Sequence, residues 1–457
     1  MNTLQSPFRR VACDAPNPIK NIMKTYKILL LTVLGLLLLA QTSARELPTD
    51  AVLAVKPTQQ PDRVVLTWAD DPATTQSITW RTSTEIGESF AELAKADSAP
   101  TFHESKQTFA AKKEFVESQL MQYHSHSITL TGLEPNTMYC YRVGQGDSWS
   151  EWFTFTTGGQ SGEPFSFLYF GDAQNGLDSV YPRIVRKAFL TLPEAKFAIF
   201  AGDLVDVGSN ERSWDHWFGA LGFLAATYPI MSIPGNHEHE KFTDSEGNET
   251  RPLSNLWRPL FTLPENGPDD LKETCYTFVY NGVRFIGLDS TKGAYDFRGE
   301  GEIADWLEGV LKNNTSRWTV VYFHHPIYSS AKERNHVEWR AAIKPILDRY
   351  QVDLVLQGHD HVYTRTGMHT PGVEVVDLEN VTERDVNSRT VYVTSVSGEK
   401  MYELRNKPFF EQALADVQLF QSIRIEGNTL ALTSQTLTGT VVDAFVIEKS
   451  PSGSVLR

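Results

Sequence analysis

Six side chains that could bind metal ions occupy one kind of position in this sequence. Each stands at or just beyond the end of a short apolar run, such as FSFLYF before Gly171-Asp172 or WTVVYF before His324. Runs of that length and composition are typical of buried β-strands. In α/β folds the carboxyl ends of strands meet where ligands bind. We therefore expect six residues to converge: Asp172, Asp203, Asn236, His324, His359 and His361.

The chemistry of this set is that of a two-metal site. Two carboxylates, one amide and three imidazoles supply oxygen and nitrogen ligands without a thiolate, which argues against structural zinc and suits Fe, Zn or Mn. Six ligands are too many for one tetrahedral ion but suit two ions that share a carboxylate. Two such ions can clamp phosphoryl oxygens and convert a bound water into hydroxide near neutral pH. The pattern predicts a metal-dependent hydrolase of phosphate esters.

The elements around these residues indicate an α/β domain over about residues 164–448. The apolar strands alternate with helical stripes at 180–189, 303–311 and 343–350, and strand patterns return from about residue 388. Buried strands that alternate with helices are typical of α/β folds.

Residues 50–157 have a different pattern. Short alternating strands, such as 63–68 and 76–81, follow one another at intervals of about ten residues, which is typical of a β-sandwich. His124 and His126 are interpreted as strand residues of this domain. Residues 158–162, GGQSG, are interpreted as a linker.

The motifs that carry the six residues resemble, in the same order, the signature of the calcineurin-like metallophosphoesterases: Gly-Asp twice, Gly-Asn-His-Glu, Val-x-x-His and Gly-His-x-His. The last two forms and the N-terminal domain are similar to those of purple acid phosphatases. The resemblance covers about residues 60–365. It implies a fibronectin-III-like all-β sandwich at 50–157, followed by an αββα four-layer catalytic domain at 164–448.

The resemblance also implies which ion each side chain binds. One ion would be held by three residues and the second by four, with one aspartate shared. The first set is Asp172, Asp203 and His361, and the second is Asp203, Asn236, His324 and His359.

The sequence departs from purple acid phosphatases at Asp206. That family has a tyrosine three residues after the bridging aspartate, and its phenolate bound to ferric iron gives the colour. Without it we expect no purple chromophore. The segment GDLVD also resembles serine/threonine phosphatases, in which the second aspartate orients the histidine of GNHE. Asp206 is therefore either a metal ligand or, in the interpretation we favour, the partner of His237.

Three histidines beside the ligands are predicted to act on the substrate. His237 would stabilise the transition state or protonate the leaving oxygen, with Asp206 keeping its imidazolium form available. His325 and His336 would add positive charge for the phosphate. The histidines without a motif are interpreted as surface or core residues: His103, His216, His239 and His369.

Three functions fit these observations. The first is a phosphatase that hydrolyses phosphate monoesters by attack of a metal-bound hydroxide. The second is a phosphodiesterase or nucleotide pyrophosphatase, because the same centre serves both reactions. The third is a surface binding module with an inactive catalytic domain.

Composition limits the partners. The formal net charge is −14, with 42 Lys and Arg against 56 Asp and Glu, so the chain lacks the basic footprint of a nucleic-acid binder. A small phosphorylated substrate is the expected partner.

An export signal is predicted near the N-terminus. Residues 24–44 carry two lysines, an apolar run of about 13 residues and a small-residue cleavage site, whereas a membrane span needs roughly 20. We expect residues 1–44 to be a signal peptide with an over-long start before Met23. The mature protein would be secreted or periplasmic, without stable membrane insertion. Cys140 and Cys275, which remain in it, are interpreted as free thiols.

Overall fold

The computed structural model describes residues 56–243, 245–247, 249–295, 299–332, 334–368, 389–405, 410–451 and 453–457. The predicted signal peptide and His369 lie outside these residues. Among the helices of the described residues, none has the length and apolar character needed to cross a membrane.

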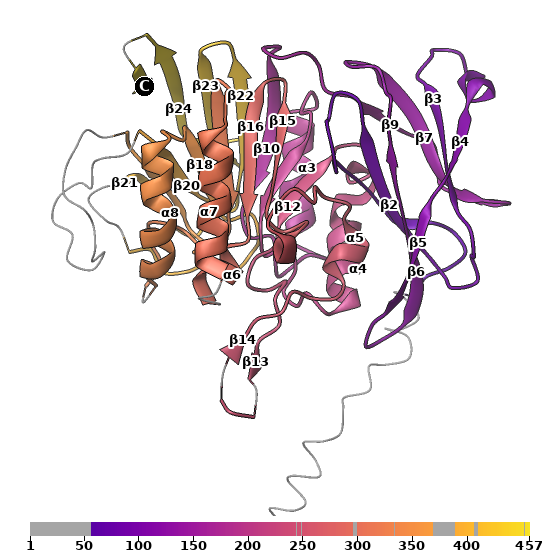
Figure 1. Ribbon diagram of the computed structural model, residues 1–457, viewed down its shortest axis with the longest axis horizontal. Helices are drawn as coiled ribbons and strands as arrows, with labels where there is room; N and C mark the ends of the chain where they lie inside the picture. The colour runs from indigo at the N-terminus through magenta and orange to yellow at the C-terminus, as the bar shows by residue number, and fades with distance from the viewer. Residues whose placement is uncertain are drawn as a thin grey trace, which may run out of the picture. The chain divides into compact units, whose positions relative to one another are not determined.

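Two antiparallel sheets form the N-terminal domain (Figure 1). Alternate residues of each strand point inward, so that Leu66, Ile78 and Trp80 of one sheet share a core with Tyr141 and Val143 of the other. A short 3₁₀ helix, η1 (Phe102–Ser105), lies between two strands of the second sheet. The first sheet has the order β1 (Asp62–Thr67), β2 (Gln76–Thr82), β6 (Gln122–Leu130) and β5 (Lys112–Glu117). The second has the order β4 (Gln107–Ala110), β3 (Phe90–Lys95), β7 (Met138–Gln145) and β8 (Ser148–Trp149), and β9 (Phe153–Thr156) also pairs with β7.

Two seven-stranded mixed sheets form the centre of the catalytic region. We call them sheet A and sheet B. Sheet A has the order β12 (Ile230–Ile233), β11 (Ala198–Ala201), β10 (Phe165–Phe170), β22 (Leu419–Glu426), β23 (Thr429–Thr436), β24 (Val441–Ser450) and β25 (Gly453–Leu456). Sheet B has the order β15 (Tyr276–Tyr280), β16 (Val283–Leu288), β17 (Trp318–Phe323), β18 (Leu354–Gln357), β20 (Val391–Thr394), β19 (Tyr363–Thr366) and β21 (Phe410–Leu414).

The sheets pack face to face, and helices cover their outer sides. Phe167 of sheet A and Phe285 of sheet B meet edge to face at 5.3 Å between ring centroids. On the outer side of sheet A, α3 (Tyr181–Thr191) and α4 (Glu211–Leu221) join the same core. On the outer side of sheet B, α7 (Gly299–Lys312) and α8 (Val337–Arg349) bury the apolar stripes that the sequence predicts. The expected αββα layers and the preceding β-sandwich are therefore confirmed.

Seven strands determine where the chemistry lies. β10, β11 and β12 are parallel in sheet A, and β16, β17, β18 and β20 are parallel in sheet B. The carboxyl ends of five of them, β10, β11, β12, β17 and β18, lead into the loops that carry the predicted ligands. The remaining short elements are η2 (Gly222–Leu224), β13 (Phe242–Thr243), β14 (Glu249–Thr250), α5 (Trp257–Leu260), η3 (Asp269–Leu271) and α6 (Ser290–Tyr295). The β13–β14 hairpin projects from the lower edge in Figure 1.

The β-sandwich is joined to sheet A by direct contacts. The hydroxyl of Tyr141 donates to the carbonyl of Ala226 at 2.7 Å, and Trp68 packs on Phe197 at 5.4 Å between centroids. The predicted linker is held by hydrogen bonds, because the backbone N–H of Gly159 donates to the side chain of Asn281. It is therefore a packed crossover between the domains rather than a free spacer.

Four charged residues meet in the same junction, three of them buried and Asp62 partly exposed, and we call them the junction cluster. The Oε2 atom of Glu211 on α4 accepts a hydrogen bond from the guanidinium group of Arg63 at 2.7 Å. The same oxygen lies 3.7 Å from the guanidinium group of Arg81. Arg81 also donates both arms of its fork to Asp62, at 2.7 and 2.8 Å. The cluster thus contains two permanent cations and two carboxylates.

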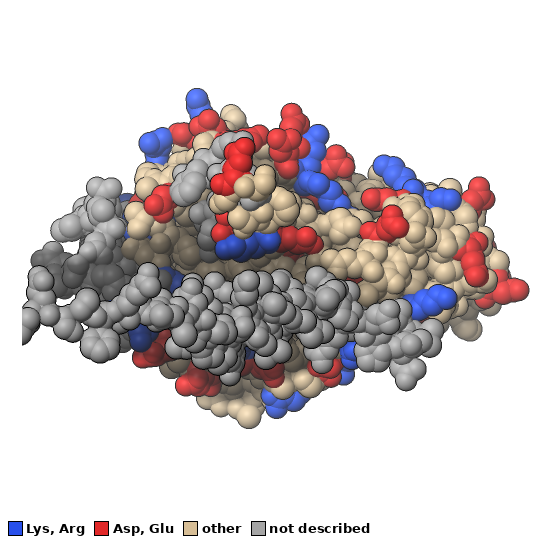
Figure 2. Space-filling view, turned by 90° about the horizontal axis from the view of Figure 1, so that it is seen from below, with Lys and Arg blue, Asp and Glu red and all other residues tan. Residues whose placement is uncertain are grey.

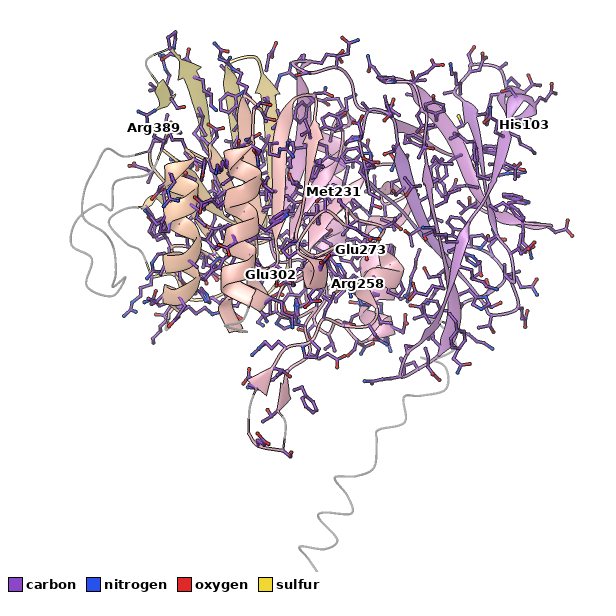
Figure 3. All side chains as sticks on the ribbon, viewed as in Figure 1. His103, Met231, Arg258, Glu273, Glu302 and Arg389 are labelled. Carbon is purple, nitrogen blue, oxygen red and sulfur yellow. The ribbon has the colours of Figure 1, made fainter. Side chains whose placement is uncertain are left out.

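Residues that the sequence left outside the site are found in ordinary structural roles. Cys140 and Cys275 are free and buried. His126 is a buried residue of β6 that contacts the hydroxyl of Thr82 at 2.7 Å. His103 lies in η1, at the outer end of the β-sandwich (Figure 3).

Candidate metal centre

The six predicted ligands converge in two groups at the carboxyl ends of the parallel strands. Asp172, Asp203 and His361 bring one ligand atom each within 4.8 Å of one another, and all three are buried. His324 and His359 form a second such group, together with His325. These side chains lie up to nearly 190 positions apart in the sequence, so only the fold brings them together.

The two sheets contribute different ligand types. Loops after β10, β11 and β12 of sheet A supply the three oxygen ligands, and loops after β17 and β18 of sheet B supply the three imidazoles. The site therefore lies where the ends of both sheets meet. The oxygen ligands are Asp172, Asp203 and Asn236, and the imidazoles are His324, His359 and His361.

Four ligand atoms of the second predicted set meet around His324. Its Nε2 atom lies 3.1 Å from Asp203 Oδ2, 3.2 Å from Asn236 Oδ1 and 3.1 Å from His359 Nδ1. Its other nitrogen, Nδ1, donates to the carbonyl of Ala201 at 2.9 Å. That bond fixes the tautomer and leaves Nε2 facing the other ligands, as in most metal-bound imidazoles.

The first predicted set is arranged in the same way. His361 Nδ1 donates to the carbonyl of Lys400 at 2.7 Å, and its Nε2 lies 3.3 Å from Asp172 Oδ1. That carboxylate oxygen is buried and has no hydrogen-bond partner among the described residues. A buried carboxylate oxygen without a donor is costly, and a cation would satisfy it. The donor set and this oxygen fit a metal ion.

The backbone explains why glycines stand beside most of the predicted ligands. Asp203, His359 and His361 all have positive φ angles, of 51°, 72° and 46°, which residues with a Cβ rarely adopt. Strained backbone of this kind concentrates at functional sites. A Cβ on Gly235 would lie 2.2 Å from Asp203 Oδ1, and one on Gly358 would lie 2.4 Å from Asp172 Oδ2. Only glycine allows the ligand loops to approach so closely.

Glu238 holds two of these loops together. Its buried carboxylate accepts hydrogen bonds from the backbone N–H groups of Gly235, Asp203, Leu204 and Val205, at 2.7 to 3.1 Å. Burial raises its pKa to about 7, and the charge of Asp203 acts in the same direction. The sequence shows Glu238 only as the last letter of a motif, and its positioning role becomes visible only in the fold.

The electrostatics of the site stabilise positive charge where the ligands meet. Burial lowers the pKa of His324, but the carboxylates of Asp203 and Asp172 outweigh it and raise the value to about 9. Conversely, burial opposes ionisation of Asp203, yet His324 and His237 hold its pKa below the ordinary range. Among the described residues, neither aspartate pairs with a lysine or arginine. The site therefore favours cations in this place.

His237 lies beside the bridging aspartate, as predicted, at the solvent side of the site. Its Nε2 atom is 3.9 Å from Asp203 Oδ2, and its side chain is 25% exposed. Nδ1 donates to the backbone carbonyl of Asp206 at 2.6 Å, whereas the Asp206 carboxylate is 3.7 Å away and accepts from Asn175. Asp206 therefore contacts His237 mainly through its backbone, which the sequence did not indicate.

His325 and His336 lie behind His359 rather than beside an open face. The ring of His325 is 4.3 Å from that of His359 and 4.9 Å from that of His336, between centroids. Burial lowers the pKa of His325 well below its ordinary value and that of His336 to about 3. Both are therefore neutral near pH 7, and His325 makes a hydrogen bond with Ser290 Oγ at 2.9 Å.

Two further buried groups were missed by sequence reasoning. His239, interpreted as a surface or core histidine, is a buried residue 3.2 Å from the carboxylate of Asp289. Asp360, between two predicted ligands, accepts from the backbone N–H groups of Ser330 and Ala331 at 2.6 and 3.1 Å. Its position in Gly-His-Asp-His was a signal that could have been read as structural support for the loop.

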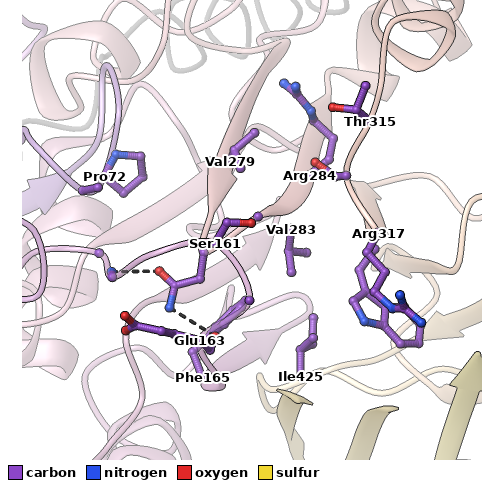
Figure 4. A pocket seen from close by; sticks show the side chains of 18 of the residues that line it. Pro72, Ser161, Glu163, Phe165, Val279, Val283, Arg284, Thr315, Arg317 and Ile425 are labelled. Atoms are coloured by element: carbon purple, nitrogen blue, oxygen red, sulfur yellow. Dashed lines mark hydrogen bonds between the residues drawn. The ribbon is translucent and has the colours of Figure 1, made fainter. Parts of the chain in front are cut away.

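A large cavity elsewhere is not a candidate for this chemistry. It measures about 620 Å³ and is lined by residues such as Pro72, Glu163, Arg284 and Arg317 (Figure 4). Pro72 comes from the β-sandwich, whereas Glu163, Arg284 and Arg317 lie near the amino ends of β10, β16 and β17, opposite the ligands. Among the described residues, no histidine lines the cavity. The visible surface in Figure 2 intersperses acidic and basic side chains without a broad basic stripe.

Comparison with known proteins finds similarity to phosphoesterases in both domains. The family model of the purple acid phosphatase N-terminal domain matches residues 61–157, and that of the calcineurin-like phosphoesterases matches residues 165–363. Probable purple acid phosphatase 20 of Arabidopsis thaliana is 30% identical over 250 residues, which cover 52% of this chain and 55% of that protein. The chain thus matches little more than half the length of that relative.

Two other relatives extend the comparison. Acid phosphatase type 7 of Homo sapiens is 26% identical over 335 residues, which cover 68% of this chain and 71% of that protein. The solved structure of purple acid phosphatase PPD1 from yellow lupin seeds has a TM-score of 0.66 at 19% identity, with 86% of this chain and 75% of that one covered. That similarity establishes the fold.

Proposed function

We propose that this chain is a purple acid phosphatase-like member of the calcineurin-like metallophosphoesterases, an exported enzyme that hydrolyses phosphate monoesters with two metal ions. The observation that carries the proposal is the meeting of six oxygen and nitrogen ligands at the ends of two sheets. The relatives named as acid phosphatases support a monoester substrate. The apolar run and cleavage site at residues 24–44 support export to a secreted or periplasmic location.

The ligands divide between two ions as the motifs imply. Asp172, Asp203 and His361 would hold the first ion. Asp203 would bridge to the second, which Asn236, His324 and His359 would complete. When bound, the ions would polarise phosphoryl oxygens and supply an activated water as nucleophile. Their identity is proposed to be Fe, Zn or Mn from the ligand types.

The protein's own groups would handle the leaving oxygen. Because Nδ1 of His237 is fixed on the Asp206 carbonyl, its Nε2 is the nitrogen that can deliver a proton toward the substrate side. The exposure of His237 is consistent with that role, since His324, His359 and His361 are more deeply buried. Glu238 and Asp360 would keep the ligand loops in place.

Metal analysis and a substrate panel test the proposal. The purified chain is expected to bind two ions and to hydrolyse a monoester faster than a diester at equal metal loading. Asn236→Ala and His324→Ala should each lower activity by about a hundredfold or more, since even residues that only orient metal ligands cost 10–100-fold. His103→Ala, in an exposed residue of the β-sandwich, is the control.

Three results would change the assignment. A clear preference for a diester would make the chain a phosphodiesterase or nucleotide pyrophosphatase. Full hydrolysis in folded Asn236→Ala and His324→Ala variants would remove the metal ligands from the mechanism. Failure of the wild-type chain to bind metal or to hydrolyse any phosphate ester would favour a binding module.

A further inference from the structure

Gln174 is a buried polar side chain inside the metal centre to which no role has been given. It lies two residues after Asp172, with a relative exposure of 1%. The backbone N–H groups of Ala173 and Gln174 both donate to the carbonyl of Asp203 at 3.0 Å, so this segment is held against the loop of the bridging aspartate. The side chain is thereby directed at the predicted first ion.

The amide group touches two of the predicted ligands at once. Its Nε2 atom lies 2.9 Å from Asp203 Oδ2 and 3.0 Å from His361 Nε2. Both are acceptors, because Nδ1 of His361 carries the proton that it donates to Lys400. The amide therefore donates to the two lone pairs that a cation would use.

The oxygen atom of the Gln174 amide has no hydrogen-bond partner among the described residues. This atom, Oε1, is buried, and Asp172 Oδ1 beside His361 is in the same condition. Oxygen and nitrogen of a glutamine amide are nearly alike in shape, and a half-turn about the last bond exchanges them. After that turn, Oε1 would stand where Nε2 stands now.

Distances favour the turned amide once an ion is bound. Metal–oxygen and metal–nitrogen bonds of about 2.1 Å at right angles place neighbouring ligand atoms about 3.0 Å apart. The amide position is 2.9 and 3.0 Å from two predicted ligand atoms, which matches that spacing. An NH₂ group in the same place would point its hydrogens at a cation, whereas an oxygen would coordinate it.

We propose that Gln174 is a ligand of the first metal ion through Oε1. It occupies the coordination position left by the tyrosine that purple acid phosphatases have at the place of Asp206. The Asp206 side chain does not take that position, because it is 49% exposed and its carboxylate accepts from Asn175. The first ion is then held by Asp172, Asp203, His361 and a neutral amide. The inference rests on the two-ion centre proposed above.

Cobalt binding to the full-length chain tests this assignment. Each protein is stripped of metal with a chelator and titrated with Co²⁺, and both the bound cobalt per chain and the visible absorption band are recorded. Gln174→Leu, which has a similar volume and no oxygen, is expected to lose one ion or to bind it at least about tenfold more weakly. Gln174→Glu, which keeps an oxygen at the same place, is expected to bind two.

Gln76→Leu is the matched control. Gln76 is equally buried, its Nε2 donates to the carbonyl of Thr67, and its Oε1 also lacks a partner among the described residues, but it lies in β2 of the β-sandwich. The control should keep both ions and the wild-type spectrum. Circular dichroism and thermal unfolding of each metal-free variant verify that it is folded.

The outcomes separate this inference from the function on which it rests. If wild type binds fewer than two ions, the two-ion centre itself is wrong. If wild type binds two and folded Gln174→Leu does so with unchanged affinity and spectrum, Gln174 is not a ligand. Loss of the ion from Gln174→Glu as well as Gln174→Leu would also contradict the proposal, because it would show that the NH₂ group, rather than an oxygen, supports the site.

Discussion

Two clusters of charged side chains in the described part of the chain are balanced in different ways. In the junction cluster, the guanidinium groups of Arg63 and Arg81 face the carboxylates of Glu211 and Asp62. In the metal centre, the carboxylates of Asp172 and Asp203 face imidazoles, and within the described residues neither pairs with a lysine or arginine.

The difference separates a structural cluster from a functional one. Arginine keeps its charge at every accessible pH, so the junction cluster is neutral without any added ion. Imidazoles carry a charge only when protonated, and a metal ligand must be deprotonated. The metal centre therefore needs external cations, whereas the junction cluster does not. Burial alone would not have distinguished the two.

The largest effect on stability is expected in the junction cluster. Glu211→Ala would leave Arg63 buried without its carboxylate, which typically costs about 3–5 kcal/mol. Urea denaturation should show this loss in the free energy of unfolding, while the folded protein keeps its metal content. The double variant Arg63→Met/Glu211→Leu, which removes both charges, should be clearly more stable than Glu211→Ala. Equal stability of the two variants would show that the ion pair is not what the junction requires.

The metal centre should behave in the opposite way, with activity lost and stability kept. His237→Ala is expected to lower kcat by about a hundredfold, the lower end of what a general acid contributes. The half-exposed location of His237 predicts only a small change in the urea midpoint. The pH profile of kcat should lose its alkaline limb in the variant. An unchanged profile would assign proton delivery to another group.

Much of this arrangement could be predicted from the sequence. The apolar runs 165–170, 283–288 and 318–323 coincide with β10, β16 and β17, because a strand buried on both faces has no alternation that could be misread. The motif glycines and the predicted ligands could be located because they stand directly after such apolar runs. The fold class and the convergence of the six ligands therefore rest on strong local signals.

The rest depends on contacts between distant segments. The sequence suggested that Asp206 acts through its carboxylate, but the contact with His237 is made by its carbonyl. It also suggested charged roles for His325 and His336, but their surroundings in the fold lower the pKa of both. Gln174 was missed because a glutamine between two motifs carries no signal of its own.

The partly buried carboxylate of Glu273, outside both clusters, provides an intermediate case. Burial raises the pKa of Glu273 to about 7; Arg258, 3.6 Å away, opposes that shift, and Glu265 and Glu114 add to it. Figure 3 shows Arg258 and Glu273 near each other. The carboxylate thus has one half-exposed cation as a partner, fewer than in the junction cluster.

The raised pKa of Glu273 predicts a pH dependence of stability. Below about pH 4.5 the group is protonated in both states, and between about pH 4.5 and 7 the unfolded chain loses the proton that the folded chain keeps. The free energy of unfolding therefore falls as pH rises through that window, because the folded state must keep or bury a group that the unfolded chain ionises freely. Glu273→Gln should gain about 3 kcal/mol of stability over wild type between pH 4 and pH 8. Comparing urea midpoints of both proteins at each pH cancels the titration of the metal centre.

The smallest effect on kcat is expected at Asp206, which tests whether this residue belongs to the metal centre. Because the Asp206 carbonyl holds His237 and its carboxylate stands 3.7 Å away, Asp206→Asn should reduce kcat by less than about tenfold, which corresponds to less than about 1.4 kcal/mol in the barrier. Both cobalt ions should remain bound, since the carboxylate faces Asn175 and not the ligands. Loss of one ion would show that Asp206 is a metal ligand, in the position that a tyrosine occupies in the purple acid phosphatases. A hundredfold loss of kcat with both ions retained would instead show that the carboxylate, across that longer distance, keeps His237 protonated.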